Sequence, residues 1–220
     1  MRKLLLLRPE PGLSASMALA AETGLDAIAC PLFRIEPVEW AAPDASQYDA
    51  LLLTSANAVR QPGSRLSQVS QLPAYAVGAA TAESAEKAGL RVVGIGQSDI
   101  VELLASIPRS LKLLHLAGEH RREVESAHNI DRITVYRSTL IDDPALPSLE
   151  GLVVAVHSPR VGARLAELAG SRGETAIAAI SAAAAEACGS GWEQVAVSDR
   201  PDDASLLALA ASLCHTSQPE

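Results

Sequence analysis

Short apolar runs alternate along the chain with segments of helical periodicity, a pattern typical of α/β proteins. The predicted strands cover residues 4–7, 27–30, 50–54, 74–77, 91–93, 111–116, 133–136, 152–156, 175–180 and 194–197. The predicted helices cover residues 13–22, 56–60, 80–88, 100–106, 161–168, 182–187 and 204–214. Strands such as 50–54 and 152–156 are apolar almost throughout instead of alternating, which favours parallel sheets that helices bury on both faces.

One strand–hydroxyl–helix unit occurs twice. Ser55 and Ser158, which lie 103 positions apart, each follow an apolar run and precede a predicted helix. The same shift of 103 positions places Asp99 on Asp202. Two similar α/β units that face each other would enclose a cleft, and α/β sheets bind ligands beyond the carboxyl ends of their strands. Both serines are expected there.

The strand count predicts the domain layout. Residues 38–137 contain five predicted strands, and the rest of the chain contains two before them and three after them. We therefore predict two similar doubly wound parallel-sheet α/β domains: a discontinuous first domain of residues 1–36 and 139–220, and an inserted second domain of residues 37–138. Two extended segments, near 31–37 and 136–142, are expected to pair as a two-stranded connector.

Composition and charge narrow the class of function. The 220 residues carry a net charge of −8, which argues against nucleic acid and anionic membranes as partners but leaves an anionic small ligand open. Cys30, Cys188 and Cys214 lie far apart without a C-x-x-C spacing, so we expect buried free thiols and no metal site. The apolar run at the N-terminus stops at Arg8-Pro9, too short for a signal peptide or membrane span, which predicts a cytoplasmic protein.

Hydroxyl side chains at strand–helix junctions are the first candidates for a site. Thr54-Ser55 and Ser158-Pro159 each place a hydroxyl where a predicted strand turns into a helix. Serine at such a position commonly caps the helix, and capping without ligand contact is one interpretation. The other is that these hydroxyls, with the free backbone N–H groups of the helix N-termini, bind carboxylates or phosphates.

The other candidate motifs are less informative. The Gly-Ile-Gly segment 94–96 lacks the third glycine of a dinucleotide fingerprint, and the chain has no Walker lysine. His115 lies in an apolar run and is expected in the core, whereas His157 stands beside Ser158 and is placed to line the cleft. Tyr136 stands where the second connector leaves the inserted domain, and is either a buried tyrosine with a satisfied hydroxyl or a residue of the cleft.

Taken together, these motifs resemble those of the uroporphyrinogen-III synthase family. The matching residues are Arg8-Pro9 with Gly12, the segment 53–59 with Thr54, Ser55 and Asn57, the segment 76–82 with Gly78 and Thr81, Gly118-Glu119, the segment 135–139 with Tyr136, and Ser158-Pro159. Each motif is weak alone, but their order and spacing over the whole chain are specific.

Three departures from the family pattern stand out. The family's Gly-Pro-Thr-Thr-Ala turn is replaced by Ser181 and four alanines, so its threonine side-chain contacts do not carry over. The segment 116–118 reads Leu-Ala-Gly where members often have Leu-Arg-Gly. Pro62-Gly63 interrupts the helix that follows Ser55.

The resemblance implies two α/β domains joined by a β-ladder and a cofactor-free lyase acting on hydroxymethylbilane, a linear tetrapyrrole with eight carboxylates. The terminal hydroxyl leaves to give an azafulvene, ring D attacks through its substituted α-carbon, and the spiro intermediate re-closes with ring D inverted. Tyr136 is the expected catalytic residue, because a phenol is protonated at neutral pH and can donate to the departing hydroxyl. The expected substrate-binding residues are Arg8, Thr54, Ser55, Asn57, Gly78, Thr81, Gly118, Ser158 and Ser181.

The alternative function belongs to a different class: a non-catalytic two-lobed binding or sensor protein for an anionic metabolite. Only an enzyme would divert the product of hydroxymethylbilane away from the symmetric isomer that forms spontaneously. For the enzyme, the expected partners are hydroxymethylbilane and, transiently, the preceding pathway enzyme. No cofactor, metal, nucleic acid or membrane is expected, and the chain is expected to be a monomer.

Overall fold

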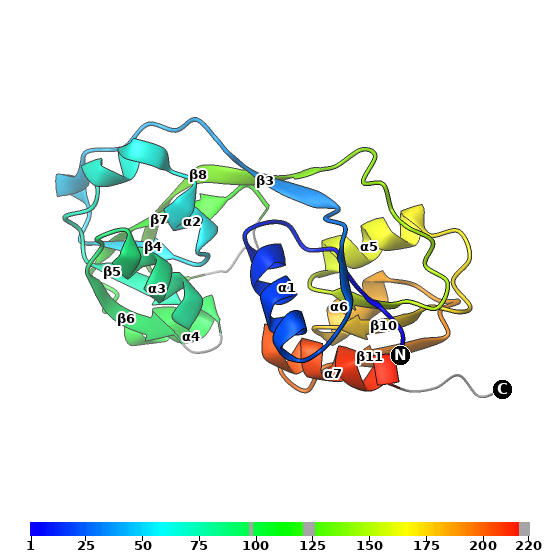
Figure 1. Cartoon of the computed structure of the whole chain (residues 1–220). Coiled ribbons are helices and arrows are strands. Elements are labelled where there is room, and N and C mark those ends of the chain that lie inside the picture. The colour runs from blue at the N-terminus through cyan, green and yellow to red at the C-terminus, as the bar shows by residue number, and fades with distance from the viewer. Residues whose placement is uncertain (97–98, 121–125, 216–220) are drawn as a thin grey trace. The chain divides into compact units, whose positions relative to one another are not determined.

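The computed structural model describes residues 1–96, 99–120 and 126–215, and the chain divides into two compact units (Figure 1). Unit 1 consists of Met1–Arg34 and Leu140–Glu220, and unit 2 consists of Ile35–Thr139. Each unit holds a sheet of mostly parallel strands with helices packed against it. The predicted fold class, two doubly wound α/β domains, is confirmed.

Unit 1 contains a five-stranded sheet in the order β11-β10-β9-β1-β2, and every neighbouring pair is parallel. Its strands are β1 (Leu4–Leu6), β2 (Ala27–Ala29), β9 (Val153–Val156), β10 (Ala176–Ala179) and β11 (Gln194–Val197). Its helices are α1 (Gly12–Glu22), α5 (Pro159–Leu168), α6 (Ala182–Ala187) and α7 (Asp203–His215).

Alternate residues of the central strands in unit 1 enter two separate hydrophobic cores. Leu5 and Val154 belong to the core that α5 and α6 cover. Leu4 and Val153 belong to the core that α1 and α7 cover. Figure 1 shows α1 beside α7 and α5 beside α6. Both faces of the sheet are therefore buried, which explains why these strands are apolar at every position.

Unit 2 contains most of a six-stranded sheet in the order β3-β8-β7-β4-β5-β6, in which β3 begins and β8 ends in unit 1, and the pairs from β8 to β6 are parallel. Its strands are β3 (Phe33–Pro37), β4 (Ala50–Leu53), β5 (Ala74–Val77), β6 (Val92–Gly96), β7 (Lys112–Gly118) and β8 (Asn129–Leu140). Its helices are α2 (Asn57–Arg60), α3 (Ala79–Lys87) and α4 (Ile100–Ser106), with 3₁₀ turns η1 (Ala45–Gln47) and η2 (Gly63–Gln68). Leu51 and Leu53 face the core beneath α2 and α3, and Leu52 faces the core beneath α4.

The internal repeat is visible in the topology. β4 begins at Ala50 and β9 at Val153, which reproduces the shift of 103 residues found in the sequence. The order β8-β7-β4-β5-β6 in unit 2 corresponds to the order β2-β1-β9-β10-β11 in unit 1. In unit 2, β7 and β8 follow the repeated strands β4–β6 along the chain, whereas their counterparts β1 and β2 in unit 1 precede the repeated strands β9–β11. The two units are therefore permuted copies of one arrangement.

Two extended segments carry the chain between the units, as the sequence predicts. β3 and β8 are neighbours in one sheet, and hydrogen bonds of 3.0 Å flank them, from Val38 N to Val135 O and from Ile141 N to Leu32 O. The predicted strand 133–136 is too short, because β8 runs without a break into the second connector.

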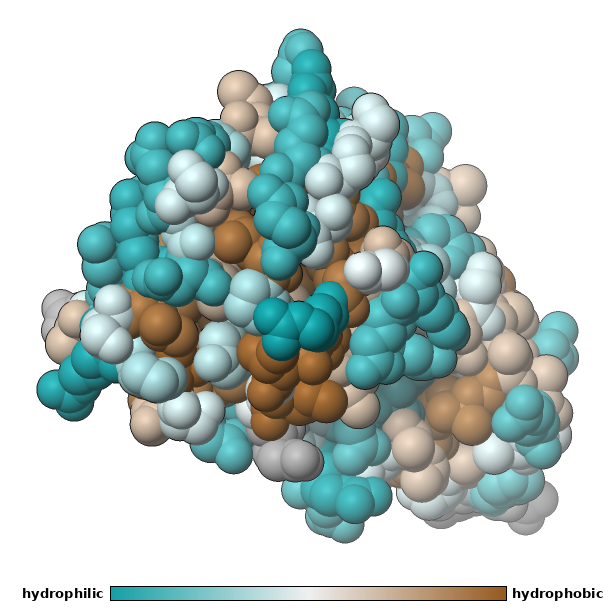
Figure 2. Space-filling view, turned by 90° about the vertical axis from the view of Figure 1, so that its left-hand side faces the viewer, coloured by the Kyte–Doolittle hydropathy of each residue, from teal (hydrophilic) through white to brown (hydrophobic). Residues whose placement is uncertain are grey.

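The predicted strand 91–93 is also too short, since β6 continues to Gly96. Glycine is a poor strand former, but here it makes room: a Cβ on Gly94 would lie 2.7 Å from the Tyr75 ring, and one on Gly96 would lie 2.8 Å from Leu103 Cβ. The opposite face of this edge strand exposes Val93 (43%) and Ile95 (47%). Figure 2 looks at unit 2 and shows hydrophobic surface on this side of the molecule.

Gly162 allows α5 and α6 to pack closely. A Cβ at this position would lie 2.8 Å from the Ala184 carbonyl oxygen and 3.0 Å from Cys188 Sγ. The carbonyl belongs to the backbone of α6 and cannot rotate away. The absence of a side chain at Gly162 is therefore a packing requirement of this helix pair.

Replacing Gly162 by alanine should destabilise unit 1. Overpacking by one methyl group costs about 1–3 kcal/mol, and the better helix propensity of alanine returns at most about 1 kcal/mol. We expect Gly162→Ala to lower the melting temperature by about 2–8 °C in calorimetry. Gly170→Ala is the matched control, because a Cβ there has nothing within 4 Å. Equal melting temperatures of the two variants would contradict this packing argument.

Candidate functional site

Polar side chains and two glycines collect where the parallel strands end. In unit 2, Thr54 and Ser55 follow β4, Gly78 follows β5, and Gly118 ends β7 beside Tyr136 of β8. In unit 1, Arg8 follows β1, His157 and Ser158 follow β9, and Ser181 follows β10. Since the carboxyl ends of parallel strands meet at one edge, the predicted site residues form two groups, one at the carboxyl edge of each sheet.

Thr54 and Ser55 have partners within unit 2. Thr54 Oγ1 lies 3.1 Å from Nε2 of His115, which is buried in β7 as predicted. Ser55 Oγ accepts a 3.2 Å hydrogen bond from the backbone N–H of Asn57. The segment that follows is a single turn of helix ending before Pro62, as the interruption in the sequence predicts.

The next junction of unit 2 is built on a left-handed glycine. Gly78 precedes α3 and has a φ of +78°. A residue with a side chain would adopt this backbone conformation only under strain. Thr81, in the first turn of α3, is only 5% exposed. Gly78 therefore presents backbone at this junction, while the Thr81 side chain belongs mainly to the interior.

Tyr136 and Gly118 form one structural pair. They are register partners in β8 and β7, next to a bulge between Ala117 and Gly118. A Cβ on Gly118 would lie 2.6 Å from Tyr136 Cζ and 2.8 Å from its hydroxyl oxygen. The phenol thus lies directly over the glycine. Tyr136 is half-buried against the core beneath α2 and α3, and its hydroxyl has no hydrogen-bond partner among the described residues.

The serines of unit 1 are helix caps. Ser158 Oγ accepts a 3.3 Å hydrogen bond from Val161 N at the start of α5, and Ser181 Oγ accepts one of 3.3 Å from Ala184 N at the start of α6. Capping is therefore confirmed for Ser158 and is also found at Ser181, and it leaves the serine O–H groups without an acceptor in the part of the chain that the structure describes. In the alanine turn after Ser181, Ala183 is exposed and Ala184 is fully buried.

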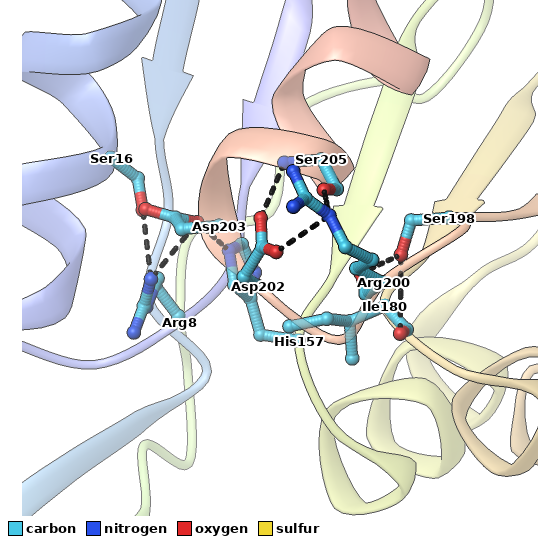
Figure 3. Close-up of polar contacts among 9 residues, drawn as sticks. All are labelled: Arg8, Ser16, His157, Ile180, Ser198, Arg200, Asp202, Asp203 and Ser205. Atoms are coloured by element: carbon cyan, nitrogen blue, oxygen red, sulfur yellow. Dashed lines mark hydrogen bonds and ion pairs between the residues drawn. The ribbon is translucent and has the colours of Figure 1, made fainter. Parts of the chain in front are cut away.

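Arg8 is held in a polar network at the carboxyl edge of unit 1 (Figure 3). Its Nη1 donates to Ser16 Oγ at 3.0 Å and forms an ion pair with Asp203 Oδ1 at 3.0 Å. Ser16 Oγ donates in turn to Asp203 Oδ2 at 2.7 Å, and His157 Nε2 lies 2.8 Å from Asp203 Oδ1. The guanidinium rests on Gly12, where a Cβ would lie 2.5 Å from Arg8 Nε.

A second set of contacts fixes the start of α7 (Figure 3). Asp202 Oδ1 accepts a 2.7 Å hydrogen bond from Ser205 N, and Asp202 pairs with Arg200 at 3.4 Å. Ser198 Oγ donates to the backbone carbonyls of Ile180 and Arg200. The helix that carries Asp203 therefore begins at a fixed place beside the ends of β10 and β11.

The surroundings of this network shift the pKa values of His157 and Asp203. Burial lowers the pKa of His157, and the nearby Arg8 charge adds to this, although Asp203 opposes it. Burial acts to raise the pKa of Asp203, but hydrogen bonds from His157 and Ser16 and the charge of Arg8 lower it overall. Asp203 is therefore ionised and His157 neutral near pH 7, with Nε2–H as the donor to the carboxylate.

Ser16 and Asp203 were not predicted as site residues from the sequence. Ser16 lies in an alanine-rich helix and Asp203 directly follows the capping residue Asp202, so each has a simpler explanation. The one available signal was the combination of Arg8 with Gly12, whose spacing lets the arginine fold back onto α1. His157 was expected to line a cleft, and its side chain is instead only 7% exposed.

A cavity of about 500 Å³ lies elsewhere in unit 1, near the amino ends of β9 and β10. Its charged lining residues are Asp142, Asp143, Glu150 and Glu174. Four carboxylates repel an anionic ligand, so this cavity does not suit a polycarboxylate.

The remaining features that could carry function are thiols, metal ligands and membrane spans. All three cysteines are free and buried, as predicted. Within residues 1–96, 99–120 and 126–215, no group of three or more His, Cys, Asp or Glu side chains could hold a metal ion. No helix in that part of the chain is long and apolar enough to cross a membrane.

The stability of the protein should fall as the pH drops below about 6.5, the ordinary pKa of histidine. The folded-state pKa of His157 is lowered, so the unfolded chain binds more protons in the window just below pH 6.5. Its contribution is therefore complete above that window and is lost as the pH falls through the folded-state pKa. The stability that Asp203 contributes is lost only at lower pH, below the ordinary aspartate pKa of 3.8, because its folded-state pKa is lowered.

Urea unfolding at pH 7.5, 6.0 and 5.0 measures this effect. His157→Gln should flatten the dependence of the unfolding free energy on pH in this range. His215→Gln, which changes an exposed histidine at the end of α7, should keep the wild-type slope. A wild-type slope in His157→Gln would show that His157 is not the group responsible.

Comparison with known proteins places this arrangement in a family. Residues 14–208 match the family model of uroporphyrinogen-III synthase HemD. The uroporphyrinogen-III synthetase structure from Helicobacter pylori has a TM-score of 0.69 at 17% identity, with 97% of this chain and 100% of that chain covered. A mutant uroporphyrinogen III synthase from the extremely thermophilic bacterium Thermus thermophilus has a TM-score of 0.55 at 18% identity, with 96% and 98% covered. The structures share the fold, and the family model spans most of the sequence: the chain belongs to the uroporphyrinogen-III synthase family.

Proposed function

We propose that the chain performs the reaction of its family, the cyclisation of hydroxymethylbilane to uroporphyrinogen III with inversion of ring D, as a hydro-lyase that needs no cofactor. The observation that supports the chemistry is the Tyr136 phenol, which lies over Gly118 at the carboxyl edge of unit 2 with its hydroxyl unpaired among the described residues. The binding-protein alternative gains no support from the family match.

Tyr136 acts as the general acid in this proposal. The phenol donates its proton to the terminal hydroxyl of hydroxymethylbilane, the C–O bond breaks, and water leaves. Ring D then attacks the resulting azafulvene through its substituted α-carbon, and the spiro intermediate breaks and re-closes with ring D inverted. The ring carbon that forms the last bond loses a proton, which returns to the phenolate, so the enzyme is regenerated.

Substrate binding falls to the polar groups at the two carboxyl edges. Each set binds carboxylates of hydroxymethylbilane: Arg8, Ser158 and Ser181 in unit 1, and Thr54, Ser55, Asn57, Gly78 and Gly118 in unit 2. Most of these offer hydroxyl or backbone N–H donors at helix starts, and Arg8 adds a cation. Their task is to hold a flexible chain in the geometry for inversion, since closure without inversion occurs spontaneously.

The surroundings of the enzyme follow from the instability of its substrate. Hydroxymethylbilane closes to the symmetric isomer by itself, so a short path from its source limits that loss. The proposal therefore includes a transient contact with the preceding pathway enzyme and a monomeric protein in the cytoplasm. The net charge of −8 gives no basis for binding nucleic acid or anionic membranes.

Isomer analysis tests the proposed function. Freshly generated hydroxymethylbilane is mixed with the wild-type protein without air, and the products are oxidised and separated by chromatography. We expect isomer III to dominate. The proposal would be contradicted, and a binding protein favoured, if the folded protein left the symmetric isomer as the sole product, as in buffer alone.

Tyr136→Phe should slow formation of uroporphyrinogen III by about 10-fold or more, because general-acid assistance is typically worth about 10²–10⁴-fold. The variant should keep its melting temperature, since the hydroxyl bonds no described residue. Tyr75→Phe, another tyrosine of unit 2, is the matched control and should keep the wild-type rate. Wild-type turnover by folded Tyr136→Phe would leave Tyr136 as a packing residue.

Ser158→Ala should reduce binding more than chemistry. It removes a helix cap worth about 0.5–2 kcal/mol of stability and one hydroxyl donor, while the backbone N–H groups of α5 remain. We expect a raised KM, a lower melting temperature and an unchanged proportion of isomer III. Loss of all turnover from a folded Ser158→Ala protein would mean that the serine takes part in the chemistry.

A further inference from the structure

We propose that Asp203 and His157 are positioning residues, which hold the Arg8 guanidinium in the orientation that binds a substrate carboxylate. This inference rests on the proposed function and adds two residues, neither of which was expected to bind substrate, from elements distant in the sequence. Arg8 follows β1, His157 follows β9, and Asp203 begins α7.

Asp203 is built into the network on both carboxylate oxygens. Oδ1 accepts from Arg8 Nη1 at 3.0 Å and from His157 Nε2 at 2.8 Å, and Oδ2 accepts from Ser16 Oγ at 2.7 Å. Ser16 is fully buried and the His157 side chain is 7% exposed, so two of the three donors have little freedom to move. The carboxylate is therefore a fixed anchor for Arg8.

The anchor occupies only one end of the guanidinium. Both polar contacts of Arg8 involve Nη1, and among the described residues Nε and Nη2 have no acceptor. These two nitrogens form the edge that binds a carboxylate through two parallel hydrogen bonds. The Arg8 side chain is 29% exposed, so part of it is open to solvent.

Gly12 completes the arrangement. Its missing side chain leaves room for Arg8 Nε and Nη2, which would lie 2.5 and 2.6 Å from a Cβ. The Nε–Nη2 edge therefore lies beside the first residue of α1, a helix of 11 residues. A long, flexible arginine would otherwise lose much conformational freedom on binding, and the anchor removes that cost in advance.

The charges around the network agree with a role in orientation. Asp203 neutralises the charge of Arg8, and His157 is neutral near pH 7 because burial lowers its pKa. Arg200 and Asp202 form an ion pair in the neighbouring turn, so their charges also neutralise each other. Binding by Arg8 therefore depends on where its N–H groups point, which is what Asp203 and His157 determine.

Steady-state kinetics with hydroxymethylbilane test the inference. Asp203→Asn should raise KM by about 10-fold or more, as expected for weakening a charge-assisted contact, and leave kcat within about two-fold. Asp202→Asn is the matched control: it makes the same charge change one residue away and keeps a capping oxygen for α7, and it does not touch Arg8. It should leave KM unchanged.

A double-mutant cycle distinguishes positioning from direct contact. If Asp203 acts through Arg8, adding Asp203→Asn to Arg8→Ala should raise KM no further. Should Asp203→Asn fail to fold, Ser16→Ala serves instead, with an expected rise in KM of about 2–10-fold. An unchanged KM in a folded Asp203→Asn or Ser16→Ala protein, or additive effects in the cycle, would overturn the inference. Failure of the wild type to form uroporphyrinogen III would instead overturn the proposed function.

Discussion

Burial of both faces of each sheet is the constraint on which the rest of this molecule depends. The central strands β1, β4, β9 and β10 are fully buried along their lengths, so they leave no place for a polar side chain within the sheet. Around these four strands, polar groups are confined to the points where the strands end and helices begin. Because the strands run parallel, these points gather at a single edge of each sheet.

That constraint decides what kind of site the chain can build. At the carboxyl edges the structure offers helix starts, a left-handed glycine, capping serines and one arginine held by Asp203. These groups donate hydrogen bonds, as a substrate with many carboxylates requires. The cavity at the amino ends of β9 and β10 is lined by four acidic residues and offers the opposite chemistry. Volume alone would point to this cavity, whose charges do not suit a polycarboxylate.

The sequence was a good guide to elements and a poor guide to contacts. Buried parallel strands are continuous apolar runs, so β4, β5 and β9 could be placed within a residue or two, and the 103-residue repeat indicated two similar units. β6 was predicted too short, because its glycines are explained only by the Tyr75 ring and Leu103 that pack on them. The Arg8 network escaped prediction for a similar reason: Ser16 and Asp203 are 187 residues apart, and only the fold joins them.

The central claim is that the carboxyl edges of the two sheets bind the tetrapyrrole. Backbone amide chemical shifts of isotopically labelled protein, titrated with uroporphyrinogen III in the absence of air, test it most directly. The account predicts that the amides of Arg8, Gly78, Gly118 and Ser158 shift together with one saturation curve. Shifts confined to residues 142–150 and 168–175, around the acidic cavity, with none at these four positions would contradict it.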